Sequence, residues 1–125
     1  MLKIRGLECG YGRMRVLEGV SLDVGKESVG LFGPNGAGKT TLIGAVMGMN
    51  KLWAGEIEFA GRQIGGTDTH LMARMGVALV PQERELFPGM SVEDNLVLGA
   101  AYIPHAKGII PEQMEKVFAL FPILK

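Results

Sequence analysis

The chain of 125 residues has little of several residue types, and each shortage excludes a class of protein. The single cysteine, Cys9, excludes an internal disulfide, so we expect one buried thiol. Thirteen basic residues balance thirteen acidic ones, which argues against a nucleic-acid partner or a polybasic membrane anchor. No uncharged apolar run approaches the roughly 18 residues of a membrane-spanning helix, since residues 96–103 form a far shorter run. The first ten residues carry Lys3, Arg5 and Glu8, which is not typical of a signal peptide.

The composition does supply the material for a hydrophobic core. Hydrophobic residues make up 47% of the chain, which is typical of a globular protein and not of a disordered one. A chain of this length buries roughly two thirds of its unfolded surface and usually forms one domain. We therefore expect a soluble protein of the cytoplasm that is free to dock on a membrane partner.

Hydrophobic periodicity predicts a mixture of strands and helices. Alternating or short apolar segments predict five strands, over residues 2–8, 17–24, 28–33, 55–61 and 76–80. The segment 55–61 is bracketed by glycines and is interpreted as a hairpin strand, while residues 9–15 are expected to form a loop that carries Tyr11. Four helices are expected, over residues 39–48, 67–75, 92–100 and from Pro111 onward.

Three groups of side chains refine the helix predictions. The first helix is expected to turn Leu42, Val46 and Met49 inward. Ser91 and Asp94 resemble a capping box at the start of the third helix. The last helix has an apolar stripe, formed by Met114, Val117, Phe118 and Phe121.

A glycine-rich phosphate-binding motif lies between the third strand and the first helix. Its residues fit the pattern G-x-x-x-x-G-K-[ST]: Gly33, Pro34, Asn35, Gly36, Ala37, Gly38, Lys39 and Thr40. Glycines permit backbone conformations in which successive N–H groups converge on phosphate oxygens. The helix that follows adds the positive end of its dipole. The motif therefore predicts a nucleotide-phosphate site.

The residues at the end of the motif have separate predicted roles. Lys39 is expected to reach the β and γ phosphates, and Thr40 to coordinate magnesium. Thr41 is expected to bond the α phosphate. These roles predict a nucleoside triphosphate together with Mg²⁺.

The segment "GPNGAGKTTL", followed by "VPQ" 41 residues after Lys39, resembles the ATP-binding subunits of ABC transporters. The resemblance covers the whole chain and implies an α/β P-loop NTPase core with an antiparallel β subdomain at the amino terminus. It implies that Tyr11 stacks on adenine with Val16 packed nearby. It also implies that Gln82 positions the attacking water or the magnesium ion.

A longer stretch, "VPQERELFPGMSVEDNLVLGA", is similar to the importer subunits for branched-chain amino acids. In that family this region faces the membrane subunits, so they are the implied partners through the region around Gln82. A second ATP-binding subunit is the other implied partner. The resemblance further implies a cytoplasmic protein that is peripheral on the inner face of the cell membrane.

Several parts of the family pattern are missing from these 125 residues. No run of four apolar residues ends in the magnesium-binding Asp and catalytic Glu, and Asp23 follows only Ser21 and Leu22 inside an alternating strand. No signature loop is present, and His70 and His105 lie too early to be the switch histidine. Residues 1–125 are therefore expected to be the amino-terminal part of one ABC-type domain, able to bind Mg-ATP at most.

The missing segments imply that strands 28–33 and 76–80 lack their neighbours, which would leave unpaired backbone groups and a marginal fold. Two alternatives stay open. The chain is either part of a transport ATPase or a non-catalytic nucleotide-binding or interaction module. A small P-loop kinase is less consistent, because no arginine-rich lid is present and Tyr11 and Gln82 would have no role. The coding sequence beyond Lys125 distinguishes the first two.

Overall fold

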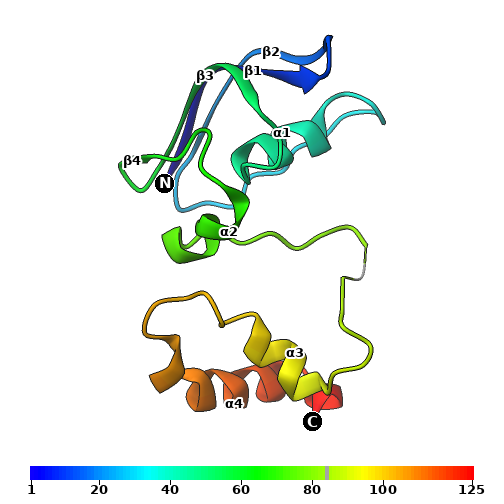
Figure 1. The fold of residues 1–125 in the computed structure, drawn as a ribbon, viewed down its shortest axis with the longest axis vertical. Coiled ribbons are helices and arrows are strands. Elements are labelled where there is room, and N and C mark those ends of the chain that lie inside the picture. Colours follow the sequence, from blue (N-terminus) through cyan, green and yellow to red (C-terminus); the bar gives the residue numbers. More distant parts are fainter. Residues whose placement is uncertain (84) are drawn as a thin grey trace. The chain divides into compact units, whose positions relative to one another are not determined.

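The structure, a computed structural model, describes residues 1–83 and 85–125. These residues divide into two compact units, Met1–Met72 and Ala73–Lys125. The first unit contains strands and two helices (Figure 1): β1 (Leu2–Tyr11), β2 (Met14–Val24), α1 (Lys39–Val46), β3 (Leu52–Phe59), β4 (Arg62–Gln63) and α2 (Thr69–Met72). The second is helical, with 3-10 turns before, between and after the helices: η1 (Ala73–Met75), α3 (Val92–Leu98), η2 (Ala106–Gly108), α4 (Ile110–Leu120) and η3 (Pro122–Leu124).

The strands form one antiparallel sheet in the order β2-β1-β3-β4, which confirms the predicted antiparallel subdomain. The hairpin at the end of β3 is also confirmed. The predicted loop over residues 9–15 is wrong in extent, because β1 and β2 continue until Tyr11 pairs with Met14. Only a two-residue turn remains, and Gly12 adopts a positive φ of 59° that such a turn favours.

Two glycines shift the alternation of β1 and β2. The register is irregular between Ile4 and Leu7, where Gly6 has a φ of 54°. Gly19 in β2 also has a positive φ, 64°. A bulge inserts one residue and moves the following side chains to the other face. The buried residues of β1 are therefore Ile4, Leu7 and Cys9, and Cys9 is the buried thiol predicted from the sequence.

An ion pair on the exposed face joins β1 to β2. The guanidinium of Arg5 donates to both carboxylate oxygens of Asp23, with Nη1–Oδ1 at 2.7 Å and Nη2–Oδ2 at 2.8 Å. The hydrogen bond from Arg5 holds the pKa of the Asp23 carboxyl below its usual value. Because both side chains are more than half exposed, water screens the pair and its effect on stability is small.

Helix α1 packs against β1 and β2 and supplies the other side of the core (Figure 1). Its buried residues are Thr41, Leu42, Gly44 and Ala45. The inward position of Leu42 is therefore confirmed, Val46 is half-buried, and the prediction for Met49 is wrong, since 54% of that residue is exposed. The helix ends at Val46, and Gly48 reverses the chain with a φ of 71°, so Met49 no longer follows the helical face.

The segments 28–33 and 76–80 were predicted to be strands, and the structure assigns neither of them to a strand. The sheet of the first unit consists of β1 to β4 alone. Within the described residues both segments therefore lack strand partners, as expected from the missing neighbours. In the first segment Val29 and Leu31 are nearly half exposed, and Phe32 is 93% exposed.

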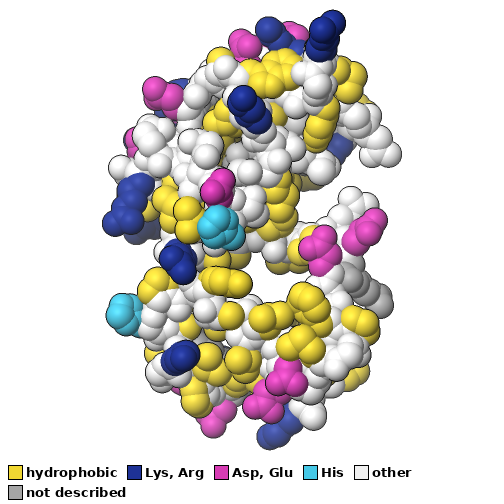
Figure 2. Space-filling view, viewed as in Figure 1, with side chains coloured by type: hydrophobic (Ala, Val, Ile, Leu, Met, Phe, Trp, Pro, Cys, Tyr) yellow, Lys and Arg dark blue, Asp and Glu magenta, His cyan; other side chains and the backbone are white. Residues whose placement is uncertain are grey.

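In the second unit, α3 and α4 line the two sides of a hollow. A small cavity of about 100 Å³ lies between them, with mostly apolar walls that include Leu96, Val97, Met114 and Val117. Figure 2 shows hydrophobic side chains gathered over this unit. Val117 and two other members of the predicted stripe, Met114 and Phe118, are half-buried. Phe121 is 57% exposed, because α4 ends at Leu120 and Phe121 leaves the helical conformation with a φ of −131°.

Two side chains fix the loop that precedes α3. Ser91 is the N-cap, and its hydroxyl accepts a hydrogen bond of 3.1 Å from the backbone N–H of Asp94, as predicted. Asn95 accepts from the N–H of Phe87 at 3.0 Å. Its amide nitrogen donates to the carbonyls of Phe87, Met90 and Ser91 at 3.1, 3.4 and 2.9 Å. The loop is thus held by the helix that follows it.

We expect Ser91→Ala to lower the stability of α3 by about 1 kcal/mol, because the first turn loses its only side-chain cap. Hydrogen exchange of the amides of Asp94 and Asn95 measures this loss as faster exchange. Ser28→Ala, at an exposed position outside any helix or strand, serves as the control and should leave these rates unchanged. Equal rates in both variants would contradict the capping role.

Candidate functional site

The glycine-rich loop turns sharply before α1. Gly36 and Gly38 have φ angles of 83° and 93°, which only glycine adopts without strain. The N–H of Ala37 donates to the carbonyl of Pro34 at 3.2 Å and closes the turn. Gly38 is the N-cap of α1 and provides no side-chain cap. The amides of the first turn of α1 therefore receive no hydrogen bond from the side chain of the N-cap residue.

The amides at the start of α1 precede the helical hydrogen-bond ladder. The first bond runs from the N–H of Leu42 to the carbonyl of Gly38 at 2.8 Å. The N–H groups of Lys39, Thr40 and Thr41 therefore have no carbonyl one turn earlier within the helix. Such amides, together with the helix dipole, form an anion-binding geometry.

The ammonium group of Lys39 lies across this loop. Its Nζ donates to the carbonyls of Gly33 and Pro34, both at 2.6 Å. An ammonium group has three donors, so one further hydrogen bond is open to an anion. The positive charge is therefore fixed at the start of the glycine-rich loop.

A second interaction holds the loop against the sheet. A Cβ atom added to Gly38 would lie 2.8 Å from Cδ2 of Leu17 and 3.3 Å from Cγ1 of Val16. Val16 and Leu17 on β2 therefore pack directly against the loop. This places Val16 beside the predicted phosphate site, while its part in holding adenine stays a prediction.

Tyr11 connects the end of β1 to α1. Tyr11 is 50% exposed, and its hydroxyl lies 3.3 Å from Oγ1 of Thr41. Asn50 donates from Nδ2 to the Tyr11 hydroxyl at 3.5 Å and to the carbonyl of Thr41 at 3.3 Å. The structure thus brings Tyr11 to the helix that follows the loop. Sequence reasoning did not find Asn50, because a lone asparagine after a helix is an ordinary stop signal.

The two threonines differ in exposure. Thr41 is buried, and its hydroxyl is directed to Tyr11, so its predicted bond to the α phosphate rests on its backbone N–H. Thr40 is exposed in the first turn of α1. A hydroxyl oxygen beside phosphate oxygens fits the all-oxygen coordination of Mg²⁺. The role of Thr40 as a magnesium ligand stays a prediction.

Gln82 belongs to the second unit and is exposed. Its predicted contact with magnesium or the attacking water stays a prediction. Among residues 1–83 and 85–125, no group of three His, Cys, Asp or Glu side chains could hold a metal ion.

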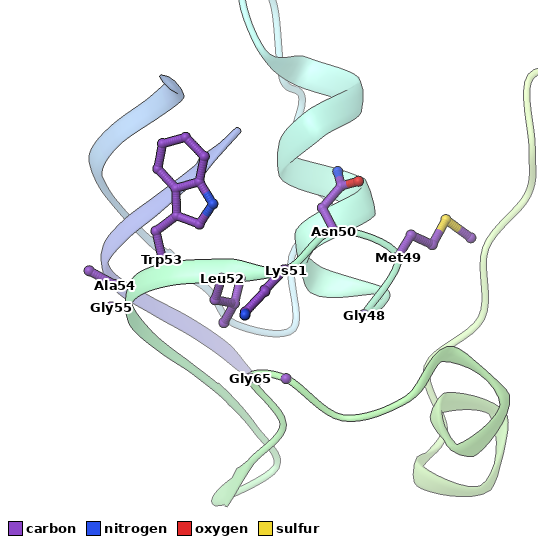
Figure 3. A pocket seen from close by; sticks show the side chains of 10 residues that line it. Gly48, Met49, Asn50, Lys51, Leu52, Trp53, Ala54, Gly55 and Gly65 are labelled. Atoms are coloured by element: carbon purple, nitrogen blue, oxygen red, sulfur yellow. The ribbon is translucent and has the colours of Figure 1, made fainter. Parts of the chain in front are cut away.

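A cavity of about 640 Å³ lies elsewhere in the first unit (Figure 3). Its walls come from the segment after α1, the start of β3 and two glycines, and include Met49, Lys51, Leu52, Gly65 and Gly66. None of the predicted phosphate-binding residues lines it. We assign the candidate site to the loop and not to this cavity, because the loop carries the predicted phosphate-binding motif with the Lys39 ammonium fixed on it.

The loop at the start of α1 and the antiparallel sheet together define a P-loop NTPase fold of the ABC ATPase type. The family model described as "ABC transporter" matches residues 17–125. The chain therefore belongs to the ABC transporter family, as its sequence motifs indicated.

Curated relatives agree with this family and differ in what they are named for. The chain is 46% identical over 92 residues to a probable ABC transporter ATP-binding protein of Azorhizobium caulinodans, covering 73% of this chain and 33% of that protein. It is 36% identical over 126 residues to the high-affinity branched-chain amino acid transport ATP-binding protein BraG of Pseudomonas aeruginosa, covering 100% and 53%. It is 39% identical over 108 residues to the ribose import ATP-binding protein RbsA of Chromobacterium violaceum, covering 86% and 21%. The chain thus spans about half or less of these relatives.

The fold also matches solved structures. One described as the structure of an ATP-binding subunit of an ABC transporter superposes with a TM-score of 0.85 at 27% identity, covering 98% of this chain and 50% of that one. In the part of the chain that the structure describes, no helix is both long and apolar enough to cross a membrane.

Proposed function

We propose that the chain is part of the ATP-binding subunit that energises an ABC importer, and that residues 1–125 form the amino-terminal part of one ATP-binding domain. By itself the chain binds Mg-ATP and does not hydrolyse it. The observation that carries the proposal is the loop at α1. There Gly36 and Gly38 have positive φ angles, and Lys39 Nζ is held on the carbonyls at the start of the loop. The first-turn amides of α1 precede the helical hydrogen-bond ladder and can bind an anion.

The proposed roles of residues 33–40 and of Tyr11 rest on their places in and beside this loop, and the role of Gln82 rests on the family resemblance alone. Residues 33–38 cradle the phosphates through backbone amides, Lys39 binds the β and γ phosphates and Thr40 holds magnesium. Tyr11 stacks on adenine, since it is 50% exposed and its hydroxyl contacts α1, the helix that follows the loop. Gln82 positions magnesium or water. The absence of a catalytic Glu after an apolar run supports binding without turnover.

The proposed partners are the membrane subunits of the transporter and a second ATP-binding subunit. The loop before α3 supports the first, because Leu86, Phe87 and Met90 are exposed by 68, 55 and 39%. Asn95 holds the backbone of that loop in one shape. Arg84, in the same stretch, lies outside the described residues. The proposed location is the cytoplasm, on the inner face of the cell membrane through these partners.

Branched-chain amino acids are the proposed transport substrate. The likeness of residues 80–100 to importer subunits of that type supports this choice, together with BraG, which aligns over the whole chain. The relative named for ribose import aligns over a smaller share of the chain.

Calorimetric titration of the 125-residue chain with Mg-ATP, with released phosphate assayed in the same samples, tests the proposal. We expect binding without turnover. Sodium tripolyphosphate is the matched probe, and it should bind more weakly because it lacks adenine to stack on Tyr11, a contact of about 1 to 3 kcal/mol. Absence of binding to either probe would contradict the proposal. Sustained phosphate release would contradict the assignment of the catalytic step to residues outside this chain.

A further inference from the structure

Asn50 lines the cavity of the first unit, and its side chain reaches α1. Figure 3 shows its carboxamide turned along α1, while Lys51 and Leu52 point away from that helix. The amide nitrogen donates to the hydroxyl of Tyr11 and to the carbonyl of Thr41, at 3.5 and 3.3 Å. One side chain thus contacts both the proposed adenine-stacking residue and the first turn of α1.

The backbone around Asn50 fixes the position of this side chain. The N–H groups of Met49 and Asn50 both donate to the carbonyl of Gly44, at 2.8 and 3.3 Å. A Cβ atom on Gly44 would lie 2.6 Å from Nδ2 of Asn50, so only a glycine leaves room for the carboxamide. The reversal at Gly48 brings the chain back to this place, with a φ of 71°.

Tyr11, Thr41 and Asn50 contact one another through their polar groups. The Tyr11 hydroxyl also lies 3.3 Å from Oγ1 of Thr41, and Thr41 is buried. Tyr11 therefore meets one hydroxyl on the helix and one amide from the segment after it. Two partners at different positions restrict the rotation of a ring that is otherwise half exposed.

We propose that Asn50 is a positioning residue for adenine: it holds the Tyr11 ring against the start of α1 in the orientation that stacks on the base. The inference rests on the proposed nucleotide-binding function. A ring that is already oriented loses less rotational freedom when ATP binds, so the bound state is favoured. Since the triphosphate contacts the loop, the effect is confined to ligands that carry a base.

The test compares Asn50→Leu, Tyr11→Phe and the double variant with the unaltered chain, using Mg-ATP and sodium tripolyphosphate as probes. Leucine keeps the size of asparagine without its amide, and phenylalanine keeps the ring without the hydroxyl. Each single variant should bind Mg-ATP about 3- to 10-fold more weakly, the range expected for one net hydrogen bond. The affinity for tripolyphosphate should change by less than about twofold, because this probe carries no base and does not depend on the orientation of Tyr11.

The double variant separates positioning from a general loss of structure. If Asn50 acts through the Tyr11 hydroxyl, the double variant should bind Mg-ATP no more weakly than the weaker single variant. Met49→Ala, at the exposed neighbouring position, is the control and should leave both affinities unchanged. Melting curves of all variants accompany the titrations.

Four results would overturn the inference. Additive losses in the double variant would show that Asn50 does not act through the hydroxyl. Equal weakening of both probes by Asn50→Leu would show a structural role alone. Full Mg-ATP affinity in Asn50→Leu, with the unaltered chain still preferring ATP to tripolyphosphate, would reject the inference and leave the proposed function intact. Failure of the unaltered chain to bind either probe would reject both.

Discussion

Lys39→Ala is expected to reduce the affinity of the chain for Mg-ATP by roughly 10- to 150-fold, the effect of losing one hydrogen bond to a charged group. The structure fixes the ammonium group of Lys39 on the glycine-rich loop, 2.6 Å from the carbonyls of Gly33 and Pro34. Hydrogen bonds to charged groups contribute about 1.5 to 3 kcal/mol each, and a phosphate would receive at least one with full charge. Titration calorimetry measures the loss directly.

The fold should survive this substitution, because the Lys39 bonds lie on the exposed side of the loop. A melting temperature within a few degrees of the unaltered chain, by circular dichroism, is the expected result. Lys51→Ala removes the same charge from an exposed site outside the loop and should leave the affinity nearly unchanged. Equal affinities for Mg-ATP in all three chains would remove Lys39 from the phosphate site.

Ile57→Ala is expected to lower the free energy of unfolding by about 2 to 5 kcal/mol. Ile57 is completely buried, and it pairs with Ile4 in the centre of the sheet. Removing three carbon atoms leaves a cavity that a small, close-packed core cannot refill. Because domains of this size are stable by only about 5 to 15 kcal/mol, the variant should lose a large part of its stability.

Urea unfolding followed by circular dichroism measures this difference. Ile43→Ala is the matched control, since the same atoms are removed from a residue that is 45% exposed on α1. Its cost should be about 1 kcal/mol or less. A similar loss in both variants would show that the sheet centred on β1 is not the core of the first unit.

The local pattern of the first 75 residues was largely readable from the sequence. Alternation and glycine positions gave the β1–β2 pair, the β3–β4 hairpin, and the loop before α1. The sequence did not predict the bulges at Gly6 and Gly19, because the alternation of apolar and polar residues does not show where a glycine inside a strand adopts a positive φ. The strand predictions for 28–33 and 76–80 were wrong, because an apolar run becomes a strand only when a neighbour completes its hydrogen bonds.

The candidate site was predictable where a contiguous motif determines it and unpredictable where tertiary contacts do. The spacing from Gly33 to Thr40 located the loop. The sequence did not reveal that the Thr41 hydroxyl faces Tyr11, since that depends on the packing of α1 against β1. The hydrogen bond between Asn50 and Tyr11 joins residues 39 positions apart, and no local sequence pattern extends over that separation.

The hydrogen bonds from Asn95 to the preceding loop indicate the order in which parts of the chain fold. All its hydrogen bonds join residues at most eight positions apart, so little chain entropy is lost in closing them. The pairing of β1 with β3 instead brings Leu2 to Phe59. Local contacts form faster than distant ones. The start of α3 should therefore be formed before the sheet closes, although it lies later in the chain.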